Sequence, residues 1–295
     1  MQNVTPLAIA ALALELVPAI AFGVSSERVA GAVRRLPLAL RVVAPALFVA
    51  PYLMVSLSAH IFRWEWFALY AGLPVAIAWL LLHAAPVDPE QRGDWRDYFI
   101  LLVVGLAVDL RWFESAWPSG LRALNELFLV DAGLYGFLAI RQLRGTGYNF
   151  CLRWSDWKTG LRELLFFAPP VLVLGIALGF IHPHRNLPGI GSALLRWVAI
   201  FFFTAVPEEL FFRAWVQNLL ERRVGRRAAL VIASVVFGLS HFNKRLGPGA
   251  HFNWQYVLLA TIAGIFYGRA WRENRRVAAS TITHTSVDWL WGLWF

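Results

Sequence analysis

Ten apolar runs separated by short polar connections restrict this chain to structures whose helices cross a lipid bilayer. Hydrophobic residues make up 59% of the 295 residues and charged residues only 15%, whereas soluble domains carry about a quarter charged residues. A backbone in hydrocarbon has to satisfy its own hydrogen bonds, so helices are the expected spanning elements. We predict an all-α, polytopic membrane protein with about ten transmembrane helices, in a range of eight to ten, over residues 4–24, 42–62, 65–83, 98–112, 121–140, 163–183, 193–219, 228–243, 253–268 and 277–295.

The positions of lysine and arginine predict the orientation of these helices. Connections after the odd-numbered runs hold 19 of the 27 basic residues, and those after the even-numbered runs hold 7 when Arg111, Arg122 and Arg196, which lie near the ends of their runs, are counted with them. Because cytoplasmic connections carry the excess of basic residues, we place the odd-numbered connections in the cytoplasm and both termini outside. Only two basic residues are lysines, and the arginine-rich and alanine-rich composition indicates a bacterial source. We therefore expect an integral protein of the bacterial cytoplasmic (inner) membrane.

The net charge of +9 does not indicate a nucleic-acid partner. The basic residues lie between the apolar runs and form neither a block nor a stripe, so we expect the lipid bilayer and membrane-proximal protein as partners, and no nucleic acid. The single cysteine, Cys151, leaves no disulfide framework and no cysteine-based zinc site within the chain.

The seventh run contains the charged residues Glu208, Glu209 and Arg213 among phenylalanine, valine and leucine. Ionisable residues in a membrane span are costly and usually mark a working site. On an α-helix, Glu209 and Arg213 are four residues apart and can pair, whereas Glu208 lies about 100° around the helix. The carboxylate of Glu209 is therefore neutralised by Arg213, and the carboxylate of Glu208 is available for another role. The alternative is an ion pair that only fixes helix packing.

Histidines follow in the eighth and tenth runs. His284 and Asp288 are four residues apart and share a helix face, and His241 ends the eighth run. Each histidine alone is more typical of a hydrogen-bonded core residue. Together with Glu208, however, they favour hydrolysis by an activated water, because a buried carboxylate can take and return a proton while imidazoles position the water. Zinc held by Glu208, His241 and His284 and a metal-free, glutamate-dependent site both remain open.

The ordered motifs Glu208-Glu209-x-x-x-Arg213, Phe237-x-x-x-His241 and His284-x-x-x-Asp288 resemble the CAAX protease and bacteriocin-processing family, also called Abi, with its type II CAAX prenyl endopeptidases. The resemblance implies an all-helical intramembrane endopeptidase. By motif position, Glu208 activates the water, Glu209 and Arg213 support it, and His241 and His284 bind or polarise it and stabilise the oxyanion.

The last motif position is Asn or Asp in that family. An ionised Asp288 has no proton to donate to an oxyanion. We therefore expect Asp288 to orient a histidine, to ligate a metal or to act while protonated.

The resemblance covers about residues 156–295. We accordingly divide the chain into an N-terminal transmembrane region of unknown role, 1–155, and a protease-like core, 156–295. The expected substrate is a membrane-embedded or lipid-proximal protein or peptide segment. Two alternatives are a non-proteolytic scaffold or bacteriocin self-immunity protein, and a transporter that uses buried glutamate and histidine as a proton relay. The transporter lacks support, because no broken helices occur at matching positions of two halves.

Other polar residues within the runs have simpler interpretations. Glu15, Asn125, Glu126 and Asp131 are expected to make helix-packing hydrogen bonds or to lie at helix ends. The pair Pro169-Pro170 is expected to kink or break the sixth helix.

Overall fold

All regular secondary structure in the part of the chain that the structure describes, residues 5–184, 187–246 and 251–295, is helical. In this computed structural model, each of the ten apolar runs overlaps one continuous helical segment. Six segments are long and apolar enough to cross a membrane: Pro6–Arg35, Leu38–Ser58, Trp64–Val87, Ser119–Ile140, Trp154–Ala177 and Ile190–Val224. The predicted polytopic, all-helical membrane protein is therefore confirmed. The number of ten spans stays a prediction, because the other segments are shorter or more polar.

The chain forms two compact units, Met1–Arg144 and Gly145–Phe295, which we call the N-terminal and C-terminal units. The long polar stretch of the sequence, Arg144–Lys158, begins at this division. All the motif residues lie in the C-terminal unit.

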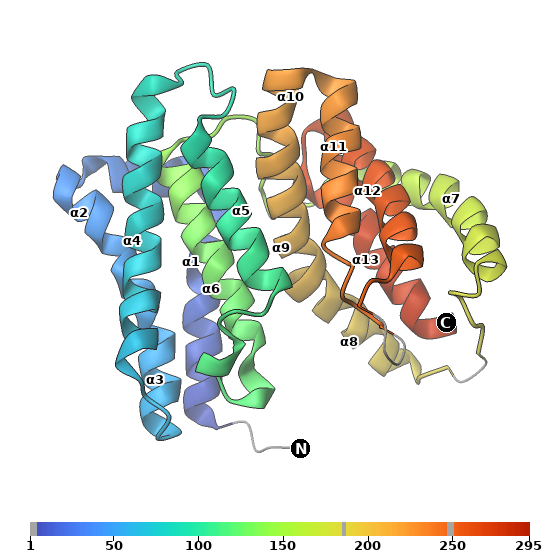
Figure 1. Ribbon diagram of the computed structural model, residues 1–295, viewed down its shortest axis with the longest axis horizontal. Coiled ribbons are helices and arrows are strands. Elements are labelled where there is room, and N and C mark those ends of the chain that lie inside the picture. Colours follow the sequence, from blue (N-terminus) through green and yellow to red (C-terminus); the bar gives the residue numbers. More distant parts are fainter. Residues whose placement is uncertain (1–4, 185–186, 247–250) are drawn as a thin grey trace. The chain divides into compact units, whose positions relative to one another are not determined.

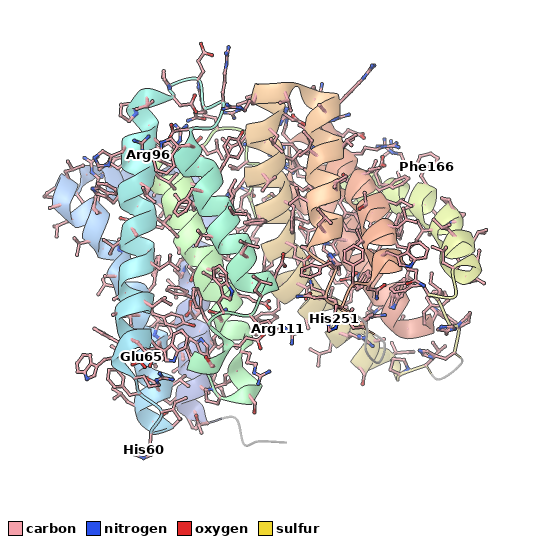
Figure 2. The ribbon with its side chains drawn as sticks, in the orientation of Figure 1. His60, Glu65, Arg96, Arg111, Phe166 and His251 are labelled. Carbon is pink, nitrogen blue, oxygen red and sulfur yellow. The ribbon has the colours of Figure 1, made fainter. Side chains whose placement is uncertain are left out.

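The N-terminal unit is a bundle in which α1, α4, α5 and α6 lie alongside one another (Figure 1). Figure 2 shows Arg96 at one end of this bundle and His60 and Glu65 at the opposite end, as expected where apolar helices meet water. Its elements are α1 (Pro6–Arg35), α2 (Leu38–Val43), η1 (Ala44–Val49), α3 (Ala50–Ser58), α4 (Trp64–Val87), α5 (Trp95–Asp109), η2 (Glu114–Ala116), η3 (Ser119–Leu121), α6 (Ala123–Leu134) and the π-helical η4 (Tyr135–Ile140).

Polar contacts around two buried residues, Arg141 and Asn125, stabilise the N-terminal unit. The guanidinium of Arg141, which is 2% exposed, donates from Nε to Asp97 Oδ1 at 3.0 Å and from a terminal nitrogen to Asp88 Oδ2 at 2.6 Å. The hydroxyl of Tyr70 donates to Asn125 Oδ1 at 2.9 Å. The helix-packing hydrogen bond expected of Asn125 is therefore present.

The C-terminal unit contains the helices that carry the motifs. In order they are α7 (Trp154–Ala177), α8 (Ile190–Ile200), η5 (Phe201–Ala205), α9 (Val206–Glu209), η6 (Leu210–Gln217), α10 (Asn218–Val224), α11 (Arg226–Leu239), α12 (Trp254–Asn274) and α13 (Val277–Trp294). Helix α7 continues across Pro169-Pro170, so the break that was one expected outcome does not occur there. Prolines interrupt transmembrane helices less than soluble ones because neighbouring groups can satisfy the freed carbonyls.

Small residues bring α11 and α12 into close contact, side by side in Figure 1. A Cβ atom on Gly238 of α11 would lie 1.9 Å from Thr261 Oγ1, and one on Gly264 of α12 would lie 2.9 Å from the Cα of Ser234. Close approach through small residues is how membrane helices gain packing energy without a hydrophobic driving force. The contact fixes the end of α11, where His241 follows.

Candidate active site

The two adjacent glutamates lie on a short α-helical turn, α9, between two π-helical segments, η5 and η6. Pro207 explains the first of these, because proline has no amide hydrogen and its ring clashes with the carbonyl four residues earlier in a regular α-helix. The wider turn is visible in the bond from the amide of Val206 to the carbonyl of Phe201. Wide turns of this kind occur frequently at functional sites.

Glu209 is the neutralised carboxylate of the pair. Its side chain is fully buried, and its Oε2 accepts a hydrogen bond from Arg213 Nε at 3.0 Å. Its other oxygen, Oε1, lies 2.9 Å from His284 Nδ1. The predicted contact with Arg213 is present, and the structure adds a second contact that sequence spacing does not reveal. Glu209 therefore joins the η6 segment to α13.

Glu208 is the more exposed carboxylate, with a side chain 25% exposed, and it lines a cavity. Among the described residues its Oε2 atom has no hydrogen-bond partner, although the atom itself is buried. The Nε2 of His284 lies 3.9 Å from this oxygen. That separation is too long for a hydrogen bond and is compatible with a bridging water.

His284 lies between all three carboxylates of the site. Because Nδ1 faces the carboxylate of Glu209, Nδ1 carries a proton and donates it, and Nε2 is left for the cavity. Asp288 Oδ2 is 3.4 Å from Nε2. The ring of Tyr267 stacks on the imidazole, with ring centres 4.5 Å apart and planes 17° apart. The ring of His284 is thus held in one orientation by a carboxylate and an aromatic face.

His241 is held by the helix that it follows. Its Nδ1 lies 2.9 Å from the carbonyl oxygen of Phe237, to which it donates because a carbonyl only accepts. This contact leaves Nε2 as the second available imidazole nitrogen. The ring of Phe237 contacts both histidines, with centre distances of 4.9 Å to His241 and 5.7 Å to His284.

A cavity of about 490 Å³ brings four of the six predicted residues to one surface: Glu208, His241, His284 and Asp288. Glu209 and Arg213 do not line it and lie behind the other four. Its remaining lining comes largely from apolar side chains of α7, α8, α12 and α13. The arrangement has the volume of a small-ligand or peptide site, with few polar groups in an apolar wall.

The residues proposed as zinc ligands do not form a metal-holding group in this structure. Over the described residues, no three or more histidine, cysteine, aspartate or glutamate side chains are arranged to hold a metal ion. We therefore derive no step through a metal, and the zinc alternative stays a prediction.

Sequence reasoning missed the aromatic residues that position the histidines. Tyr267 stacks on His284, and the ring of Tyr256 lies 4.8 Å from that of His241 in an edge-on contact. Both tyrosines belong to α12, which carries none of the motifs. No signal distinguishes them from ordinary core aromatics, because the ninth run has no charged residue or motif spacing that points to a site.

The fold and this cluster define a polytopic helical membrane protein with an ionisable, cavity-lining site on its C-terminal unit. Residues 190–290 match the family model of the Rce1-like type II CAAX prenyl endopeptidases. The matched segment includes every motif residue from Glu208 to Asp288, so the resemblance predicted from the motifs is confirmed over these residues. No curated protein and no solved structure matches the chain.

Proposed function

We propose that this protein is an intramembrane endopeptidase that hydrolyses peptide bonds in membrane-proximal protein segments with a water activated by Glu208. The family match supports a membrane protease in general. The observation that carries the finer proposal is the 3.9 Å space between Glu208 Oε2, which is buried without a hydrogen-bond partner, and His284 Nε2. A water in that space touches both a base and an imidazole.

Glu208 is the general base in this mechanism. It accepts a proton from the water as the oxygen attacks the peptide carbonyl, and it returns that proton to the leaving amine. Glu209 does not compete for this role, because both of its oxygens are engaged, one by Arg213 and one by His284. The two glutamates therefore divide the work between proton transfer and support.

The two histidines stabilise the charge that develops on the reacting carbonyl. His241 and His284 each present Nε2 to the cavity, and each is fixed through Nδ1. A protonated Nε2 donates to the developing oxyanion, and fixed donors stabilise such charge most effectively where water is excluded. Asp288, close to Nε2 of His284, favours the charged imidazole that this donation needs.

A substrate in the membrane fits the surroundings of the cavity. The outer face of α7 carries exposed apolar side chains, including Phe166 at 58% exposure, which Figure 2 shows on this helix. Leu164, Phe167 and Val171 on the same helix line the cavity. One helix thus borders both the lipid-facing surface and the site. A substrate helix has to unwind locally before its amide bond can reach Glu208.

The experiment compares protein termini in cells that produce the wild-type protein and cells that produce Glu208→Gln at the same level. We expect new termini within or beside hydrophobic segments only with the wild type. Arg227→Gln, an exposed substitution on α11 that does not line the cavity, serves as the matched control and should give the wild-type pattern. If no terminus depends on Glu208 under any growth condition, the protein is a scaffold or immunity protein instead.

A further inference from the structure

The cavity also carries positive charge that the hydrolytic mechanism does not use. We propose that Arg196, Lys244 and Arg245 form a carboxylate-binding subsite, which selects peptide segments with a negative charge a few residues from the cleaved bond. All three residues line the same cavity as Glu208. The inference rests on the proposed function only in assigning the bound group to a substrate, because binding itself needs no cleavage.

The first observation is that these cations lack acidic partners. Other basic residues of the C-terminal unit form ion pairs: Arg269 lies 3.1 Å from Glu163, and Arg276 lies 2.7 Å from Asp156. No ion pair to Arg196, Lys244 or Arg245 occurs among the described residues. Arg196 and Arg245 are exposed and Lys244 is half-buried, so all three side chains are accessible to an anionic group that enters the cavity.

The second observation is that a side chain holds the backbone at two of these cations. The side-chain amide of Asn253 donates to the carbonyls of Lys244 at 3.1 Å and Arg245 at 3.0 Å. Arg245 has a φ of 51°, a left-handed conformation that is costly for a residue with a Cβ. Strained backbone that its surroundings hold in place is characteristic of binding and catalytic sites. The backbone of Lys244 and Arg245 is therefore held where both residues line the cavity.

Aromatic rings orient the guanidinium of Arg245 along the cavity wall. Its central carbon lies 5.1 Å from the ring centre of Trp291 and 5.8 Å from that of Tyr256. Tyr256 in turn contacts the ring of His241 at 4.8 Å between centres. Because an extended peptide rises about 3.3 Å per residue, a carboxylate on Arg245 lies a few residues from a bond next to His241.

Arg196 extends the positive wall from α8. Its guanidinium donates to the carbonyl of Gly292 at 2.8 Å. A Cβ on Gly292 would lie 2.3 Å from a terminal nitrogen of Arg196, so only glycine leaves room for the side chain in this position. Arg196 has no acidic partner among the described residues, so its charge is available to an anionic group in the cavity.

The proposal is tested by binding, on the non-cleaving Glu208→Gln protein in detergent micelles. Three fluorescently labelled apolar pentapeptides serve as probes: one with a free C-terminal carboxylate, the same peptide as its C-terminal amide, and an amide with one internal leucine replaced by glutamate. We expect at least one of the two acidic peptides to bind about tenfold more tightly than the uncharged amide, which corresponds to about 1.4 kcal/mol. Which acidic peptide is preferred identifies the source of the carboxylate.

Removal of the cations should abolish this preference without changing the site otherwise. In the Lys244→Gln/Arg245→Gln double variant, and to a smaller extent in Arg196→Gln, the acidic peptides should bind as weakly as the uncharged amide. The affinity for the uncharged amide should stay unchanged, which shows that the variants are folded. The control Arg227→Gln should keep the full preference.

The proposal is overturned if the three peptides bind equally, if none binds, or if the preference survives in the double variant. A second measurement uses nanodiscs of phosphatidylcholine with and without phosphatidylglycerol. If the double variant loses only affinity for phosphatidylglycerol, the cations hold lipid headgroups and the peptide subsite is wrong. A carboxylate preference in this assay, together with no Glu208-dependent terminus in cells, would keep the subsite and refute the protease, so the two failures are distinguishable.

Discussion

Glu209→Gln should destabilise the protein far more than Glu208→Gln, although the two residues are neighbours. Glu209 is fully buried and contacts both Arg213 at 3.0 Å and His284 at 2.9 Å. Its neutralisation leaves the guanidinium of Arg213 buried without a counter-charge, which costs about 3–5 kcal/mol. The terminal nitrogens of Arg213 have no other hydrogen-bond partner among the described residues that would compensate. Glu208→Gln removes no such pair and should cost less than about 1 kcal/mol.

The assay is thermal unfolding of the purified protein in one detergent, followed by tryptophan fluorescence. At about 2–4 °C per kcal/mol, the loss in Glu209→Gln corresponds to a decrease in Tm of roughly 10 °C, against 2–3 °C or less for Glu208→Gln. The double variant Glu209→Gln/Arg213→Leu should have a Tm no lower than that of the less stable single variant, because it leaves neither charge of this pair without its partner. Equal Tm values for the two glutamine variants would refute the division of roles.

Three further predictions concern packing, metal and topology. Gly238→Leu should lower the stability by about 1–3 kcal/mol and reduce cleavage, because its Cβ would lie 1.9 Å from a hydroxyl oxygen of α12 and displace His241; Gly191→Ala, which has open space, is the matched control and should leave both unchanged. Chelator-treated protein should keep its cleavage rate, whereas about one zinc per chain with loss of activity on chelation would assign a metal mechanism. Reporter fusions at Arg153 should report the cytoplasm and those at Lys244 the outside, and a cytoplasmic signal at Lys244 would refute the ten-span topology in this half.

Much of the fold was predictable because a bilayer allows so few solutions. Each apolar run became a helical segment, since unsatisfied backbone groups are excluded from hydrocarbon. The ends were less predictable. Helix α1 extends to Arg35, whereas the apolar run ends at residue 24. Ser25, the next residue, has non-helical backbone angles, and the helix continues beyond it. Hydropathy follows the lipid-facing part of a helix and does not register where its hydrogen bonding stops.

The site was predictable where chemistry follows from spacing along one helix. The pairing of Glu209 with Arg213 and the proximity of His284 to Asp288 both come from a separation of four residues. Contacts between helices were not accessible in this way. The contact of Glu209 with His284 and the stacking of Tyr267 on His284 depend on how η6, α12 and α13 pack, which no local pattern encodes.

The most direct test of the proposed mechanism is the cleavage rate of Glu208→Gln in reconstituted liposomes, with a substrate identified from the cellular termini. The variant keeps the shape of the side chain and removes only its ability to accept a proton. We predict a decrease in kcat of at least about 100-fold, the size of general-base catalysis, at a Tm close to that of the wild type. A Glu208→Gln protein that cleaves the substrate within about twofold of the wild-type rate would contradict the assignment of Glu208 as the base.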